Sequence, residues 1–121
     1  MPKILLVEDD ALIQKAVELK FKKEGFEVIC CNDGKSGMEC LSAQLPDLVL
    51  TDLMLPYSSG LEIVSAAQAI KDKSIRIVVI SSMGQEHIVQ EAFELGADDF
   101  ITKPFSLREL VVRIKKQLKG A

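Results

Sequence analysis

The chain has 121 residues, of which 48% are hydrophobic and 27% are charged, and its formal net charge is −3. This length suits a single domain, predicted to span residues 1–121, with a sizeable buried core. The acidic balance argues against a nucleic-acid-binding or anionic-membrane surface, and no apolar run approaches the roughly 20 residues of a membrane span. The start of the chain lacks signal-peptide features, and the three cysteines lack a metal-binding spacing, so we expect a cytoplasmic protein with reduced thiols.

Short aliphatic runs alternate with amphipathic stretches along the chain. The runs, which we predict to be strands, cover residues 3–7, 27–31, 47–51, 76–80 and 99–103. The amphipathic stretches, which we predict to be helices, cover residues 11–24, 35–44, 59–71, 85–95 and 106–119. Three of the runs are continuously aliphatic, as is typical of parallel strands that are buried on both faces. The alternation predicts an α/β fold with a doubly wound, five-stranded parallel sheet and helices on both faces.

Residues at the element boundaries agree with this division. Ser106 precedes "LRE", which places Glu109 at the third helical position of a capping box. Gly25 and Gly96 stand where helices should stop, and residues 32–34, "NDG", predict a turn. The second run is the least aliphatic, and we therefore expect it at an edge of the sheet.

Four of the five predicted strands deliver a polar or charged group at their carboxyl ends, where open parallel sheets bind ligands. These groups are Glu8-Asp9-Asp10, Asp52, Ser81 and Lys103. Clustered carboxylates repel one another unless a cation lies among them, and carboxylate oxygens suit Mg²⁺. A lysine and a hydroxyl can bind phosphate oxygens, and a carboxylate can accept a phosphoryl group. Asp10 is also a candidate N-cap of the following helix.

At these positions the chain resembles a known family. "ILLVEDD", "DLVLTDLMLPYSSG", "IRIVVISS" and "GADDFITKPFS" are similar to the successive motifs of the bacterial two-component response-regulator receiver domain. The match covers essentially the whole chain, and "ITKPFSLRELVVRIKK" is similar to receivers that precede a winged-helix DNA-binding domain. The resemblance implies a flavodoxin-like strand order 2-1-3-4-5 and a cis peptide bond between Lys103 and Pro104.

The resemblance also implies a role for each residue of the predicted site. Asp52 would accept the phosphoryl group, and Lys103 would bind the phosphate. Mg²⁺ would contact Asp9 and Asp52 directly and Glu8 mainly through water. The backbone carbonyl of Met54 would supply a further metal ligand.

Two further residues match the positions that change conformation in this family. Ser81 corresponds to the switch hydroxyl, with Ser82 as its rival, and Phe100 corresponds to the switch aromatic residue. Phe100 departs from receivers that carry tyrosine or histidine there, and it has no hydroxyl to offer a partner.

The expected function is a phosphorylation-dependent signalling switch rather than an enzyme, because the resemblance is to a phosphoacceptor domain. Its partner would be a sensor histidine kinase or a phosphotransfer protein. Phosphorylation would change an interaction face made by the fourth helix, fifth strand and fifth helix, through which two copies would pair. We expect no direct contact of this domain with nucleic acid or membrane.

Three other functions compete with this interpretation. A haloacid-dehalogenase-like phosphatase also uses an aspartate nucleophile with Mg²⁺, but it needs a second aspartate where Met54 stands. A flavodoxin-like redox carrier would need a glycine- and hydroxyl-rich phosphate loop where "EDDALIQ" stands. An interaction module that is never phosphorylated would not need the complete acidic and lysine set.

Overall fold

The computed structural model describes residues 1–57 and 59–119. Ser58, within the quoted "PYSSG" stretch, and the last two residues of the predicted domain lie outside the described residues. Strands and helices alternate along the described chain, as predicted. In chain order they are β1 Lys3–Val7, α1 Ala11–Lys23, β2 Glu27–Cys31, α2 Gly34–Gln44, β3 Leu48–Asp52, α3 Gly60–Ala69, β4 Arg76–Ser81, α4 Glu86–Leu95, β5 Asp99–Thr102 and α5 Leu107–Lys119.

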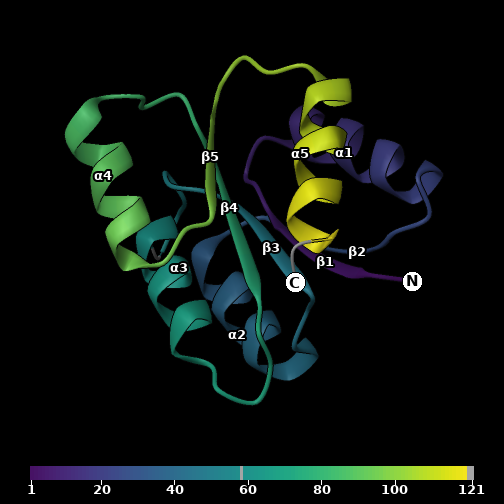
Figure 1. Ribbon diagram of the computed structural model, residues 1–121. Coiled ribbons are helices and arrows are strands. Elements are labelled where there is room, and N and C mark those ends of the chain that lie inside the picture. Colours follow the sequence, from purple (N-terminus) through teal and green to yellow (C-terminus); the bar gives the residue numbers. More distant parts are fainter. Residues whose placement is uncertain (58, 120–121) are drawn as a thin grey trace.

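The strands form one parallel sheet in the order β2-β1-β3-β4-β5. This order confirms the doubly wound, flavodoxin-like arrangement and the edge position of β2. Helices α1 and α5 cover one face of the sheet, and α2, α3 and α4 cover the other (Figure 1). Along β1, Leu5 and Val7 pack beneath α2, α3 and α4, whereas Ile4 and Leu6 pack beneath α1 and α5. Both faces are therefore buried, which explains the continuous aliphatic runs.

Several helix ends follow the predicted capping signals. Asp10 is the N-cap of α1, and its side chain accepts hydrogen bonds from the amides of Leu12 and Ile13. The amide of Glu109 donates to Ser106 Oγ at 3.2 Å, which confirms the N-terminal signal of α5. Gly96 ends α4 with a φ of 123°, a backbone conformation that favours glycine.

Other helix boundaries differ from the prediction by one or two residues. The expected turn at residues 32–34 instead contains the start of α2 at Gly34, because Asp33 acts as its N-cap. Asp33 Oδ1 accepts a hydrogen bond of 2.7 Å from the Ser36 amide. Helix α3 ends at Ala69, two residues before the predicted end, because Ile70 adopts an extended backbone conformation.

The two ends of the described chain lie together. Met1, Pro2 and Leu118 line one hollow at the edge of the sheet where the strands begin. Asp47, which directly precedes β3, lines the same hollow. None of the helices in the described part of the chain is long and apolar enough to span a membrane.

Candidate functional site

The sheet brings the predicted site residues together at the edge where its strands end. Glu8 follows β1, Asp52 is the last residue of β3, Ser81 is the last residue of β4, and Lys103 follows β5. Strand β3 ends one residue later than predicted, so Asp52 belongs to the strand and its backbone is fixed by the sheet. Glu8 and Ser81 are fully buried and Asp52 is 5% exposed. Buried polar groups at one edge indicate a site, because their desolvation must be compensated there.

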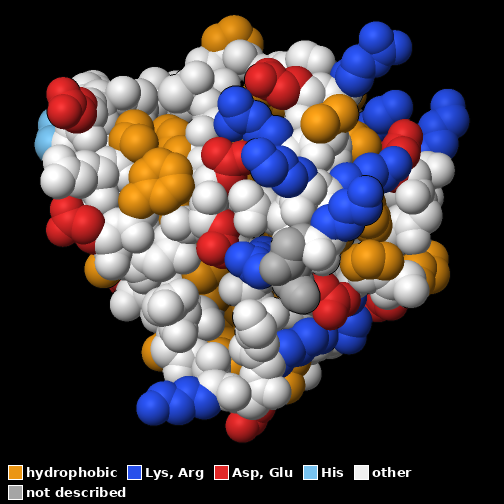
Figure 2. Space-filling view, in the orientation of Figure 1, with side chains coloured by type: hydrophobic (Ala, Val, Ile, Leu, Met, Phe, Trp, Pro, Cys, Tyr) orange, Lys and Arg blue, Asp and Glu red, His pale blue; other side chains and the backbone are white. Residues whose placement is uncertain are grey.

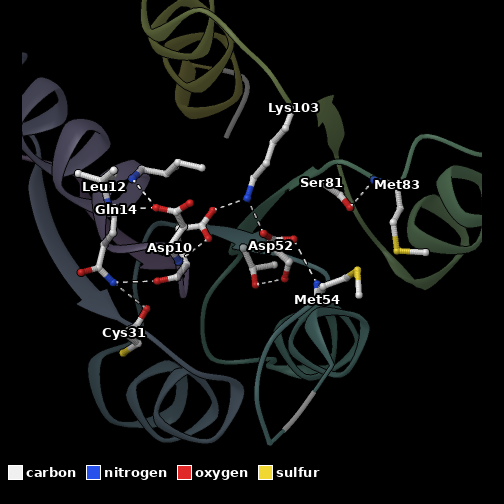
Figure 3. A network of polar contacts seen from close by, with 12 residues as sticks. Asp10, Leu12, Gln14, Cys31, Asp52, Met54, Ser81, Met83 and Lys103 are labelled. Atoms are coloured by element: carbon white, nitrogen blue, oxygen red, sulfur yellow. Dashed lines mark hydrogen bonds and ion pairs between the residues drawn. The ribbon is translucent and has the colours of Figure 1, made fainter.

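Lys103 provides part of that compensation, since its ammonium group lies between two carboxylates (Figure 3). Lys103 Nζ is 2.6 Å from Asp52 Oδ2 and 2.8 Å from Glu8 Oε1. Burial alone would lower the pKa of the lysine, but its contacts with Asp52 and Glu8 outweigh that effect and raise the pKa above 10.5. The lysine is therefore held in its charged form. The Lys103–Pro104 bond is cis, as the family resemblance implied.

Glu8 is the most deeply buried acid of the site. The amide of Asp10 donates to Glu8 Oε2 at 3.0 Å. The other oxygen, Oε1, forms the ion pair with Lys103. Burial raises the pKa of Glu8 above 4.5, although the contacts with Lys103 and the Asp10 amide oppose this rise. Each carboxylate oxygen can accept more than one contact, so Glu8 can still help to bind a further cation.

The donor atoms of the site fit a hard divalent cation. Carboxylate oxygens of Glu8, Asp9 and Asp52 all lie within 4.8 Å of one another. When all three acids are ionised, the single lysine leaves an excess of negative charge. Oxygen ligands from carboxylates, with one face open to water at the exposed Asp9, match the preference of Mg²⁺. Asp10 lies next to this cluster but uses its side chain to cap α1.

The loop after β3 continues the site. The amide of Met54 donates to Asp52 Oδ1 at 3.2 Å, so the backbone of the predicted metal-binding residue Met54 contacts the Asp52 carboxylate (Figure 3). The Met54 side chain is 60% exposed. Behind this loop, a Cβ atom at Gly60 would overlap the backbone carbonyl oxygen of Asp52. Glycine at this position therefore allows α3 to begin directly against the strand that carries Asp52.

The two predicted switch residues lie on neighbouring strands. Ser81 Oγ accepts a hydrogen bond of 3.0 Å from the amide of Met83. Ser81 is buried at the end of β4, whereas its rival Ser82 is exposed. Phe100, in β5, is partly buried against the layer of side chains between the sheet and helices α2, α3 and α4. The predicted pair thus occupies adjacent strands on the β4–β5 side of Asp52.

Known proteins of one family match almost the whole chain. Residues 4–115 match the response regulator receiver domain family. The chain belongs to this family. A receiver domain is the phosphorylation-dependent part of two-component signalling, in which such domains receive signals from histidine kinases or phosphotransfer proteins.

Solved receiver domains have closely similar folds. The receiver domain of a Francisella response regulator is 27% identical, with 99% of this chain and 98% of that chain covered and a TM-score of 0.91. A CheY-like receiver domain protein from Methanospirillum hungatei is 25% identical, with coverages of 99% and 95% and a TM-score of 0.94. The receiver domain of a signal transduction histidine kinase from Syntrophus aciditrophicus is 26% identical, with coverages of 100% and 92% and a TM-score of 0.90.

One residue that supports this receiver site was not predicted from the sequence. The Gln14 side chain, on α1, donates from Nε2 to the backbone carbonyl oxygens of Glu8 at 3.0 Å and Cys31 at 3.1 Å (Figure 3). The Glu8 amide also donates to the Cys31 carbonyl at 3.0 Å. Gln14 therefore ties the acidic loop to the end of β2. Its only sequence signal was a polar residue four positions after the N-cap Asp10, on the inward side of the helix.

Proposed function

We propose that this receiver domain accepts a phosphoryl group on Asp52 from a histidine kinase or a phosphotransfer protein. The observation that carries the proposal is the position of the Asp52 carboxylate, buried within the acidic cluster and 2.6 Å from the ammonium group of Lys103. A buried carboxylate beside a fixed cation is positioned to react with an anionic phosphoryl donor without repelling it. We also propose a cytoplasmic location for this transfer, where the three cysteines of the chain would stay reduced.

The proposed phosphoryl transfer needs only a few groups of the site. A carboxylate oxygen of Asp52 forms the new bond to phosphorus, while the bond between phosphorus and the donor's imidazole nitrogen breaks and that nitrogen takes up a proton. Lys103 stabilises the negative charge on the transferring group, and the Met54 amide orients the acceptor carboxylate. Asp9, Glu8 and Asp52, with the Met54 carbonyl, would hold Mg²⁺. When bound, the ion would neutralise part of the charge on the phosphoryl oxygens.

The conformational response would begin at Ser81. Its hydroxyl now accepts a hydrogen bond from Met83, so it must turn toward Asp52 to donate to a phosphoryl oxygen. This movement would leave space near the end of β4 into which the Phe100 ring can shift. The change would then appear on the surface formed by α4, β5 and α5.

That surface is suited to pairing with a second copy. Figure 2 shows hydrophobic side chains over α4 beside a charged strip along α5. Phe93, on α4, is 44% exposed. Arg113, on α5, contacts Asp99 at 3.3 Å and Glu109 at 3.5 Å within the same chain. Formation of a dimer would therefore exchange existing ion pairs for intermolecular ones, and burial of Phe93 would supply the main gain.

An aspartate-nucleophile phosphatase is the competing function. Met54 stands where that mechanism needs a second carboxylate, and its side chain has no proton to transfer. We therefore propose that the domain is a phosphoacceptor and not an enzyme that acts on free phosphate esters. Sustained hydrolysis of p-nitrophenyl phosphate by the purified protein would favour the phosphatase instead.

The decisive experiment measures phosphorylation at one residue. Incubation with acetyl phosphate and Mg²⁺ should add one phosphoryl group, detected by intact-protein mass spectrometry. Asp52→Asn should abolish the adduct, because an amide oxygen is a poor nucleophile. Asp10→Asn is the matched control and should retain it, because asparagine can still cap α1. An unchanged adduct in Asp52→Asn would refute the assignment of the acceptor.

Pairing is tested separately by light scattering with and without acetyl phosphate. We expect phosphorylation to increase the apparent mass, and Phe93→Ser to reduce this increase. Leu19→Ser is the matched control, because Leu19 is 57% exposed but lies on α1, away from the proposed surface. A phosphorylated protein that remains monomeric at high concentration would exclude self-association.

A further inference from the structure

Two of the three cysteines lie in contact although they belong to different elements. Cys31 ends β2 and Cys40 lies on α2, and their Sγ atoms are 3.1 Å apart. Cys30, directly before Cys31, points to the opposite face of the sheet, because successive strand residues alternate. Cys30 packs with the layer beneath α1 and α5, whereas Cys31 and Cys40 pack in the layer beneath α2. The structure therefore contains one close pair of thiols and one separate thiol.

We propose that Cys31 and Cys40 form a dithiol site, which peroxides and low-molecular-weight disulfides convert to an intramolecular disulfide. Neither residue is needed for the proposed phosphoryl transfer, so this inference does not depend on that function. The sulfur atoms must approach by about 1 Å to reach the length of a disulfide bond, a movement that side-chain rotation and a small shift of α2 can supply.

The two thiols would react in a fixed order. Cys40 is partly exposed, whereas Cys31 is 6% exposed. Burial, together with the contact with Cys40, raises the pKa of Cys31 to about 12, so this thiol remains protonated at neutral pH. Cys40 is consequently the first nucleophile, and Cys31 completes the bond.

Either a peroxide or a low-molecular-weight disulfide can oxidise the two thiols. With hydrogen peroxide, the Cys40 thiol loses its proton and its sulfur attacks one peroxide oxygen. The O–O bond breaks, a sulfenic acid forms, and the departing hydroxide takes up a proton to give water. Cys31 sulfur then attacks the sulfenic sulfur, loses its proton and displaces a second water molecule. With oxidised glutathione, Cys40 first forms a mixed disulfide and releases one glutathione. Cys31 then displaces the second glutathione.

Mass spectrometry of the purified, reduced protein tests this directly. After exposure to hydrogen peroxide or oxidised glutathione, the protein should lose two hydrogens, and only one of its three thiols should remain open to alkylation. Trypsin cuts at Lys35, between the two cysteines. The disulfide should therefore join the peptides of residues 24–35 and 36–71. The rate should rise with pH, since the attack by Cys40 needs a thiolate and Cys31 must lose its proton to complete the bond.

Cysteine variants identify the partners. Cys30→Ser is the matched control and should form the link at the wild-type rate, whereas Cys31→Ser and Cys40→Ser should not form it. Retention of the link in Cys31→Ser would assign it to Cys30 and overturn the proposal. The proposal would also fail if all three wild-type thiols stayed open to alkylation, if a stable mixed disulfide accumulated at Cys40, or if links formed only between chains.

A second probe needs no oxidant. Phenylarsine oxide binds two thiols that lie close together, and the reduced wild-type protein and Cys30→Ser should each bind one equivalent. Cys40→Ser should bind none, and this variant changes a partly exposed residue, so that it avoids disturbing the core at Cys31. A reduced wild-type protein that binds no arsenical would contradict the close pair.

Discussion

Lys103 shows how a single residue determines the electrostatics of the acceptor site. Its ammonium group contacts the carboxylates of both Asp52 and Glu8. The sequence predicts that Lys103 lies near Asp52, the proposed phosphoacceptor, but the second contact depends on the position of Glu8 above the sheet. The order of residues in the sequence does not reveal the distance between Lys103 and Glu8. We therefore expect Lys103 to stabilise the unphosphorylated protein, in addition to its proposed role in phosphoryl transfer.

Replacement of this lysine tests its role in the unphosphorylated protein. Lys103→Met keeps the aliphatic stem but leaves two buried carboxylates without their cation. In the absence of Mg²⁺, we expect the free energy of unfolding to fall by about 1–3 kcal/mol. This loss is smaller than the usual cost of removing one partner of a buried ion pair, because Glu8 can take up a proton and become neutral. Urea denaturation in EDTA measures this change. Lys116→Met, at an exposed site on α5, is the control, and equal stability of the two variants would contradict the argument.

Two methionines lead to a prediction on the lifetime of the proposed phosphoryl group. The family resemblance places Met54 and Met83 beside the path of the water molecule that hydrolyses the aspartyl phosphate. A thioether holds water poorly and cannot accept a proton from it. Decay of the phosphorylated protein in Mg²⁺ should therefore become faster in Met54→Asn and Met83→Glu. Unchanged decay in the double variant would show that these side chains do not exclude water.

At the scale of elements, α3 and β3 meet at Gly60. Gly60→Ala would place a methyl group against the carbonyl of Asp52, and relaxation is limited because the contacted atoms belong to the backbone of Asp52 and Leu53. We expect a loss of about 1–3 kcal/mol in the free energy of unfolding. At Gly84 the nearest contact of an added methyl group is Thr102 Cγ2 at 3.0 Å, so Gly84→Ala should change stability by within about 0.5 kcal/mol. Thermal unfolding of both variants gives the comparison, and equal effects would show that α3 can move away from β3.

Asp47 connects elements at the opposite edge of the sheet. Its side chain accepts a hydrogen bond of 2.7 Å from the Lys3 amide in β1 and contacts Lys73 Nζ, before β4, at 3.0 Å. The hydrogen bond from the Lys3 amide is the main reason why the pKa of Asp47 lies below 3.8, and the contact with Lys73 lowers the pKa further. Because the folded pKa is lowered, this stabilisation is complete above 3.8 and is lost as the pH falls through the folded value.

Asp47→Asn tests this pH dependence. At pH 7 the variant should be about 0.5–1 kcal/mol less stable than the wild type, a small difference because the side chain is partly exposed. The difference should vanish in acid, where Asp47 of the wild type is protonated. Urea denaturation at the two pH values measures it, with the exposed Asp72→Asn as the control. A difference that persisted in acid would indicate that geometry, and not charge, is responsible.

The elements also show where prediction from sequence succeeded and where it failed. Buried strands such as β1 and β3 were recognisable because their aliphatic runs are continuous. The start of α2 was assigned to a turn, because the "NDG" signal is the same whether Asp33 closes a turn or caps a helix. The contact between Cys31 and Cys40 was missed, because it depends on how α2 packs against β2. Local patterns specify elements, whereas side-chain pairs across elements depend on packing.

For the whole molecule, Mg²⁺ should act as a ligand that stabilises the fold. An ion that binds only the folded state and relieves repulsion among Glu8, Asp9 and Asp52 adds about 2.7 kcal/mol at a concentration 100-fold above its Kd. The melting temperature should therefore rise with Mg²⁺ concentration. Asp9→Ala should lose most of this rise, and the capping variant Asp10→Asn should keep it. A full rise in Asp9→Ala would place the ion elsewhere.

Met1 and Leu118 line one hollow on the side of the sheet away from Asp52. A domain in which residues near both ends of the described chain lie side by side can be inserted as a unit into a surface loop of another protein, with little strain on either fold. The domain is therefore suited to serve as an insertion cassette within a fluorescent protein. In such a sensor, the acceptor edge would stay open to kinases, while a shift of α5 would reach the host directly through the adjoining linker.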